Sequence, residues 1–164
     1  MKMRSVMFAA IAVFLWAMPA SSQTTSSSRH LASPFSIRIG GYIRESGYEF
    51  GQVHANSWYM NVPSKKLNKI RIIIGTSPSS LAVGAVVIPK KDLRISADSM
   101  SKMMRLSYQV NYVRFCIDPD GDLLVLAQLK ESWADLAEFN ATVQTVAAAA
   151  ERAYAEMGLI IQTP

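Results

Sequence analysis

The chain has few of the residues that most often carry out chemistry. Its 164 residues include one cysteine, Cys116, and two histidines, His30 and His54. A single cysteine forms no internal disulfide, so burial of apolar side chains must stabilise the fold. Cysteine nucleophiles need a neighbouring base. Because His30 lies in a Ser/Thr-rich stretch, His54 in an expected polar loop and Cys116 in an expected buried strand, we expect no catalytic residues, no cofactor and no enzymatic activity.

Long hydrophobic runs are also missing. The apolar run Val6–Met18 has 13 residues, fewer than the ~20 that a membrane-spanning helix needs. It follows the basic start MKMR and precedes PASSQ, an order that predicts a secretory signal peptide over residues 1–22. Cleavage after Ala20 or after Ser22 fits equally well, and an uncleaved N-terminal anchor is the alternative. We therefore expect a periplasmic or secreted protein that has no integral membrane span after cleavage.

Positive charge is scarce in the last third of the chain. Residues 29–114 contain 13 Lys or Arg and four acids, whereas residues 115–164 contain two and eight, giving net charges of +9 and −6. The basic residues are scattered and match no nucleic-acid-binding motif, so we expect no nucleic-acid partner. This uneven distribution of charge either guides docking of a second copy or a partner, or reflects two differently solvated faces of a monomer.

The remaining pattern predicts one α+β domain over residues 33–158, between a Ser/Thr-rich flexible linker at 23–32 and a short tail at 159–164. We expect a five-stranded, mainly antiparallel sheet with the order α-β-β-β-α-β-β-α. Gly84 predicts a bulge or a closely packed helix. The expected helices begin at Pro34, span 96–110, and run from Trp133 or Ala134 to Met157, and the expected strands are 57–62, 69–74, 81–88, 112–117 and 123–129.

Methionine is concentrated on the predicted middle helix, which carries Met100, Met103 and Met104. Methionine is pliable and serves both as core filler and in adaptable binding surfaces. We expect Met100 and Met103 to fill the core. For Met104 and Leu106 two interpretations stay open, namely core packing or an exposed face that docks a peptide or a second copy.

Three carboxylates alternate in DPDGD, at Asp118, Asp120 and Asp122. They match the first three ligand positions of a calcium-binding loop, but the sixth position is Leu123 instead of glycine and the twelfth is Leu129 instead of glutamate. Proline followed by Asp-Gly between two alternating apolar runs is typical of a hairpin turn. We therefore predict a hairpin and no dedicated metal ligands, and incidental calcium binding at residues 118–122 remains an alternative.

Five segments of the chain follow a known pattern, namely SWYMNV, KIRIIIG and LAVGAVVIPK, and then MMRLSYQVNYVRFCIDPDGDLLVLAQL and ADLAEFNATVQTVAAAAERAYAEM. In these segments the chain resembles the YbjN-like family of bacterial sensory transduction regulators, whose fold is similar to that of type III secretion chaperones. The resemblance covers residues 33–157 and implies no enzymatic residues. Secretion chaperones of this fold dimerise and hold partner segments in apolar grooves, so the resemblance implies a protein or peptide partner and a homodimer.

Together these observations predict an exported, non-catalytic protein-binding or chaperone-like module of the bacterial cell envelope. A small envelope enzyme with an unrecognised active site is the alternative function, as is a domain with incidental calcium binding.

Overall fold

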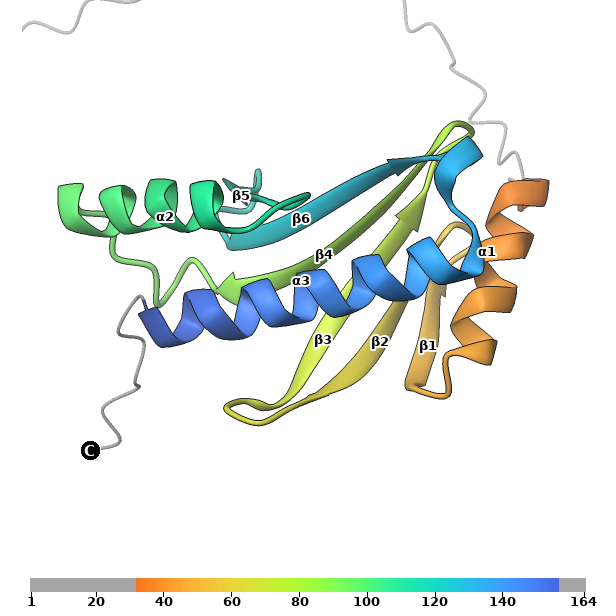
Figure 1. The fold of residues 1–164 in the computed structure, drawn as a ribbon, viewed down its shortest axis with the longest axis horizontal. Helices are drawn as coiled ribbons and strands as arrows, with labels where there is room; N and C mark the ends of the chain where they lie inside the picture. The colour runs from red at the N-terminus through yellow and green to blue at the C-terminus, as the bar shows by residue number, and fades with distance from the viewer. Residues whose placement is uncertain (1–31, 157–164) are drawn as a thin grey trace, which may run out of the picture.

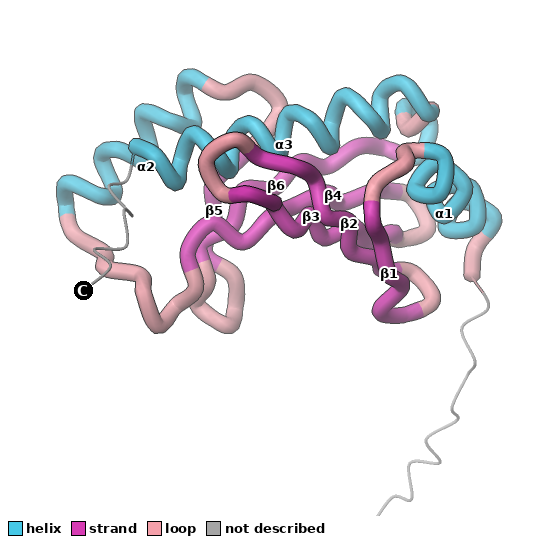
Figure 2. Tube along the Cα trace, turned by 90° about the horizontal axis from the view of Figure 1, so that it is seen from below, coloured by secondary structure: helices cyan, strands magenta, loops and turns pink. Residues whose placement is uncertain are grey.

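The computed structural model describes residues 32–156. The predicted signal peptide, nearly all of the predicted linker, the expected helix end at Met157 and Gly158, and the tail at 159–164 lie outside the described residues. Within them, one antiparallel sheet has the strand order β1-β2-β3-β4-β6-β5, and three helices lie along one of its faces (Figures 1 and 2). No helix in the described range is long and apolar enough to cross a membrane.

Helix α1 (Pro34–Glu45) begins where the sequence predicts it. The Ser33 side chain accepts a hydrogen bond from the backbone N–H of Ser36 at 3.1 Å, and Pro34 occupies the first turn. This cap satisfies one of the N–H groups that a helix start leaves without a partner. The helix then buries Phe35, Ile39 and Ile43 against the sheet.

The sheet has six strands, so the expectation of five was short by one. The additional strand is β1 (Glu49–His54), which pairs with β2 (Ser57–Ser64) at one edge of the sheet. None of its residues is buried, so it lacks the apolar alternation by which the other strands are predicted. At Gly51 the end of the Tyr59 side chain lies over the strand, where a Cβ would be only 2.6 Å from its ring.

The next strands follow the predicted alternation. β3 (Asn68–Thr76) and β4 (Ser80–Ile88) pair with each other, and β4 also pairs with β6 (Leu123–Lys130). Alternate residues point towards the helices, which is the pattern of an antiparallel sheet with one covered face. The buried face of the sheet consists of Trp58, Met60, Val62, Ile70, Ile72, Ile74, Leu81, Val83, Ala85, Val87, Leu123, Val125 and Ala127.

Gly84 marks neither a bulge nor a closely packed helix, contrary to expectation. It pairs in regular register with Ile73 and Leu126, and it faces the side of the sheet that carries no helix. The register shift in β4 lies instead between Val86 and Ile88. That shift buries the consecutive residues Val87 and Ile88.

Helix α3 (Leu136–Glu156) covers the centre of the sheet and contacts β2, β3, β4 and β6. It buries Phe139, Val143, Val146, Ala150 and Ala153, as the helical spacing predicts. It starts later than expected because residues Glu131–Trp133 form a separate 3₁₀ turn. Asp135 then accepts the backbone N–H of Glu138 at 2.8 Å, which is a helix N-cap.

Candidate protein-binding surface

Helix α2 (Ala97–Gln109) is well formed by its own residues. The Ser96 side chain accepts the N–H of Ser99 at 3.1 Å, and the Ser99 side chain accepts the N–H of Ser96 at 2.8 Å. This reciprocal pair is a capping box. Lys102 and Asp98 form an ion pair at 2.8 Å one turn apart. These local contacts specify a helix, but they do not specify which face of it packs on the rest of the protein.

The packing of α2 against the domain depends on few side chains. Leu106 is fully buried, and it is the only buried residue of the helix. Met103 and Val110 are partly buried beside it and pack against the core. At 100° per residue these three positions form one inner stripe. The Arg152 guanidinium of α3 also donates a hydrogen bond to the Gln109 side chain.

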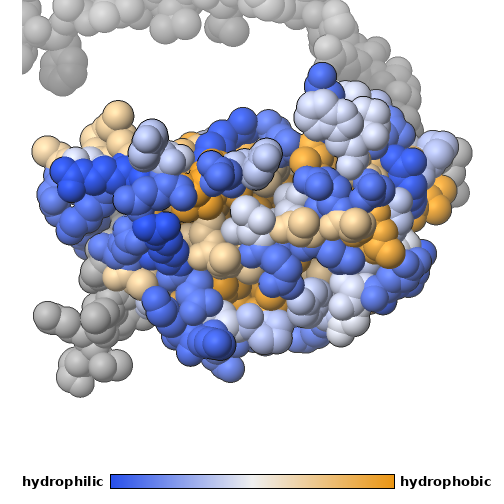
Figure 3. Space-filling model, in the orientation of Figure 1, coloured by the Kyte–Doolittle hydropathy of each residue, from blue (hydrophilic) through white to orange (hydrophobic). Residues whose placement is uncertain are grey.

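A second apolar stripe of α2 faces away from the domain. Met100, Met104 and Tyr108, here called the α2 stripe, are 49%, 72% and 90% exposed, and their spacing of four residues places them along one line of the helix. The expectation that Met100 fills the core is therefore wrong, and Met103 is only partly buried. Of the two residues left open, Leu106 belongs to the core and Met104 to the surface. Hydrophobic colour also marks the outer edge of α2 in Figure 3.

Exposed apolar residues continue into the segments that follow α2. Tyr112 is 91% exposed and has a φ of 66°, a left-handed conformation that residues other than glycine rarely adopt. Strand β5 (Arg114–Ile117) then forms the edge of the sheet beside β6, with Phe115 half-buried and Ile117 44% exposed. Ile117 pairs with the buried Leu123, so its exposure shows that this edge of the sheet is only partly covered.

A groove runs beside α3 on the same side of the sheet, between α3 and β6. One cavity of about 360 Å³ lies between α3 and β6, with Trp133 and Tyr112 among its lining residues. An adjoining cavity of about 360 Å³ shares Tyr112 and Thr145 and extends to Arg152. From Glu138 to Arg152 this α3–β6 groove is ~21 Å long at 1.5 Å per residue. An extended peptide of about six residues has that length.

The sequence alone did not indicate this groove. Trp133 is 64% exposed and lies where the 3₁₀ turn separates β6 from α3. Its aromatic ring just before a long helix was the only available signal. Tyr112 carried no signal, because its position depends on how α2 returns to β5.

The acidic turn is a hairpin, as predicted. β5 and β6 pair up to Ile117 and Leu123, and Gly121, with a φ of 92°, donates its N–H to the Asp118 carbonyl at 3.0 Å. The Asp118 carboxylate accepts the N–H of Asp122 at 2.9 Å, and the Asp122 carboxylate accepts the N–H of Lys90 at 2.7 Å. Two of the three carboxylates thus act as backbone acceptors, and residues 32–156 contain no cluster of three or more metal-ligating side chains.

Of the candidate groups for nucleophilic catalysis, His30 lies outside the described residues, and His54 and Cys116 lie far apart. His54 ends strand β1 instead of lying in a loop, and it is exposed. Cys116 is half-buried on β5, at the opposite edge of the sheet. Five strand spacings of ~4.8 Å separate the two edges by ~24 Å. Among the described residues the buried polar ones are Ser36, Asn61 and Thr142, so no carboxylate is buried beside His54.

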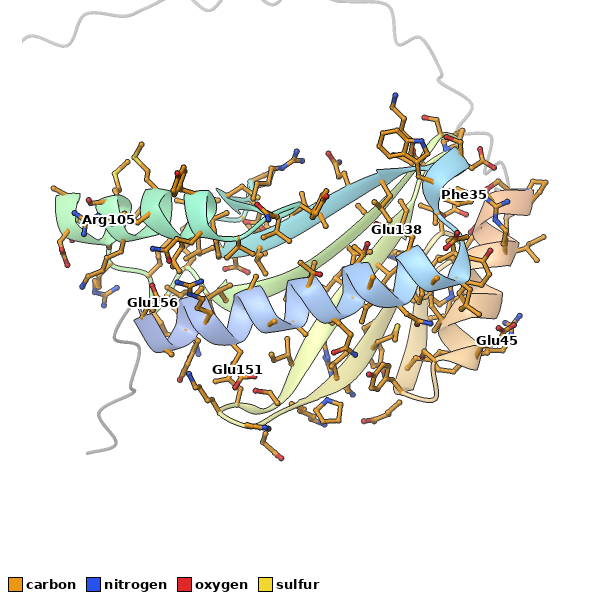
Figure 4. All side chains as sticks on the ribbon, viewed as in Figure 1. Phe35, Glu45, Arg105, Glu138, Glu151 and Glu156 are labelled. Atoms are coloured by element: carbon orange, nitrogen blue, oxygen red, sulfur yellow. The ribbon has the colours of Figure 1, made fainter. Side chains whose placement is uncertain are left out.

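The basic and the acidic residues of the sequence lie mostly on different elements. Basic residues follow the β2–β3 turn, the segment before α2, and α2 itself, whereas acidic residues lie at the β5–β6 turn and along α3. Figure 4 shows Arg105 on α2 and Glu138, Glu151 and Glu156 along α3. The α3–β6 groove carries Glu138 near one end and Arg152 at the other, and Arg105 lies beside the α2 stripe at 100° per residue.

Comparison with known proteins assigns the fold. No family model matches the chain, and no curated protein matches it significantly. A chain of the heterodimeric ExoU–SpcU complex from the type III secretion system of Pseudomonas aeruginosa is similar, with a TM-score of 0.54 and 10% identity over 71% of this chain and 95% of that one. The Yersinia pestis type III secretion chaperone SycH, in complex with a YscM2 fragment, gives 0.46 and 14% over 71% and 96%. The fold is therefore α+β and similar to that of type III secretion chaperones, as expected.

Proposed function

We propose that this protein is a non-catalytic, chaperone-like module that binds proteins and associates with a second copy of itself through the α2 stripe. The α2 stripe is the observation that carries the proposal. Three large apolar side chains lie in line on a helix that is held by one buried residue. Contiguous apolar surface of this kind marks sites of protein–protein contact.

The α3–β6 groove supplies the second element of the proposal, a place for a partner segment. Its floor includes Ala127 and Leu129 of β6, and its ends carry Trp133 and the Arg152 side chain. Aromatic side chains at such positions are typical anchors of binding energy. An extended segment of about six apolar residues with a basic side chain at one end and an acidic one at the other complements this groove, because Glu138 and Arg152 lie near its opposite ends.

The fold supports a protein partner, since the similar solved structures are chains in complexes with other proteins. Location in the periplasm or outside the cell is part of the proposal and rests on the signal-peptide pattern of residues 1–22. Membership of the YbjN-like family is also part of it and rests on the order of elements, to which the structure adds strand β1. The absence of enzymatic activity rests on the ~24 Å between the edges that carry His54 and Cys116.

Self-association is tested by Met104→Glu in the chain lacking residues 1–22. The residue is 72% exposed, so the free energy of unfolding should change by less than ~0.5 kcal/mol. Burying a carboxylate in an apolar interface without a partner costs several kcal/mol, so the dimer dissociation constant should rise at least ~100-fold. Light scattering across a concentration series and urea unfolding measure the two quantities.

Two control variants separate the α2 stripe from general effects of charge. Met104→Leu keeps the apolar character and should retain the dimer, and Asn140→Glu adds the same charge on the exposed side of α3 and should also retain it. A mass that is the same for wild type and Met104→Glu at every concentration rejects the proposed interface. A pull-down from envelope fractions with wild type and Met104→Glu then identifies partners that require the stripe.

A further inference from the structure

Strands β3 and β4 separate before either of them ends. Their pairing runs from Thr76–Leu81 to Ile72–Ala85. β3 nevertheless continues to Asn68 along β2, and β4 continues to Ile88 along β6. The register shift in β4 lies at this point, between Val86 and Ile88. The sheet is thus open between the two strands near the C-terminal end of α3 (Figure 1).

An apolar pocket of about 170 Å³ fills this opening. Known apolar cavities of about 150 Å³ accept a benzene molecule, so the pocket has room for one Leu or Ile side chain. Lys69 and Arg71 also line it. Its apolar lining combines both faces of the sheet with the last turns of α3 and includes Ile70, Ile73, Val86, Val87, Ala150 and Tyr154.

The chain itself has a suitable occupant next to the pocket. Residues 157–161 read Met-Gly-Leu-Ile-Ile, and residues 157–164 contain no charged side chain. They directly follow Glu156, the last residue of α3, and Tyr154 lines the pocket two residues earlier. Four residues of extended chain span ~13 Å, so a segment that starts beside the pocket-lining Tyr154 is long enough to reach into the opening.

We propose that residues 157–161 pack into the pocket between β3, β4 and the end of α3, with one aliphatic side chain inserted and the others covering Ile73 and Val86. Ile73 is 46% and Val86 38% exposed on the face of the sheet that carries no helix. An uncharged segment fits because inserting it requires no removal of charge from water. This docking is independent of the α2 stripe and of the proposed function.

Disulfide trapping tests the position of the segment in the full 164-residue chain with Cys116→Ser. The pair Val86→Cys and Ile160→Cys places one thiol in the pocket and one on the segment. The matched pair combines Ile160→Cys with Ala148→Cys. Ala148 is exposed and lies near the same end of α3, but it lines the cavity on the α2 side of the helix. A second control, Ile37→Cys with Ile160→Cys, uses a residue on α1, which packs beside the far end of α3.

Mild oxidation should produce the intrachain disulfide at least ~10-fold faster with Val86→Cys than with Ala148→Cys, and none with Ile37→Cys. Equal rates for the first two pairs overturn the proposal, because a segment without a fixed site reaches both. A product that is only intermolecular also overturns it and assigns the pocket to a second copy.

A stability comparison that needs no cysteine accompanies the trapping. The double variant Ile160→Asp, Ile161→Asp should lower the melting temperature by about 3–8 °C, because a domain of this size loses a few degrees for each ~1 kcal/mol of unfolding free energy. The matched variant Gln162→Asp, Thr163→Asp adds the same charge outside the apolar segment and should leave the melting temperature within about a degree. Equal shifts in the two variants contradict the proposal.

Discussion

Leu106→Ala should release α2 from the domain while leaving the sheet and α3 folded. Leu106 is fully buried, whereas the rest of α2 contributes only the partly buried Met103 to the core. Large-to-small substitutions at such positions cost about 2–5 kcal/mol. A 13-residue helix is marginal in water without tertiary contacts. The loss should therefore appear as local opening of α2 before the domain as a whole unfolds.

The magnitude follows from the lower end of that range. A loss of ~2 kcal/mol raises the population of the opened state about 30-fold, so the amide hydrogens of residues 97–109 should exchange at least ~30-fold faster. The amide hydrogens around Phe139 should exchange as slowly as in the wild type, because α3 buries eight residues of its own. Met104→Ala, compared at concentrations where the chain is monomeric, is the control, since it truncates an exposed side chain two residues away.

Hydrogen exchange followed by mass spectrometry, with peptides that separate α2 from α3, measures this difference. Equal acceleration in α2 and α3 would refute the reasoning, because α2 would then unfold only with the whole domain. The same conclusion would follow if Met104→Ala matched Leu106→Ala, since the outer stripe would then contribute as much to folding as the inner one.

Two further predictions concern the turn and its carboxylates. Gly121→Ala should lower the free energy of unfolding, measured in urea, by about 1–2 kcal/mol. Gly121 has a φ of 92°, and a Cβ there would lie 2.9 Å from the Lys90 side chain. In the control Gly41→Ala in α1, the new Cβ meets no atom within 4 Å, and the substitution should stabilise the protein by about 0.5–1 kcal/mol. Saturable binding of calcium to the folded state would raise the melting temperature by mass action. Because we predict no dedicated calcium site, calcium at 1 mM should shift the melting temperature by less than about a degree relative to chelator. A larger shift that Asp120→Asn removes would favour the calcium alternative at residues 118–122.

Much of the fold could be predicted because its elements carry local signals. Ser33 and Pro34 mark the start of α1, and period-two alternation marks β2, β3, β4 and β6. The DPDGD turn is predicted as a hairpin because its backbone requirements depend on adjacent residues only. The similarity to type III secretion chaperones follows from the order of these elements.

The errors lie where a residue's environment depends on distant parts of the chain. Strand β1 has no buried residue, so its pairing with β2 leaves no apolar pattern in the sequence. Met100 lies on an apolar helix face, but that face turns outward. A helix with two apolar stripes fits the sheet with either of them, and periodicity does not distinguish the two.

The binding surfaces show the same division. The candidate groove needs Tyr112, Trp133 and Thr145 side by side, although β5 and β6 separate Tyr112 from Trp133 along the chain and Thr145 lies within α3. Neither the α3–β6 groove nor the opening between β3 and β4 has a sequence motif. Each forms where a strand or helix continues past the point at which its neighbour stops contacting it.

The sequence by itself determined the helices, five of the six strands and the acidic hairpin, because caps, turns and alternation act over a few residues. Only the tertiary structure decided which stripe of α2 is exposed, where the sheet ends, and where grooves remain. Those features depend on which apolar faces find a partner, and the helices are too few to cover both sides of a six-stranded sheet.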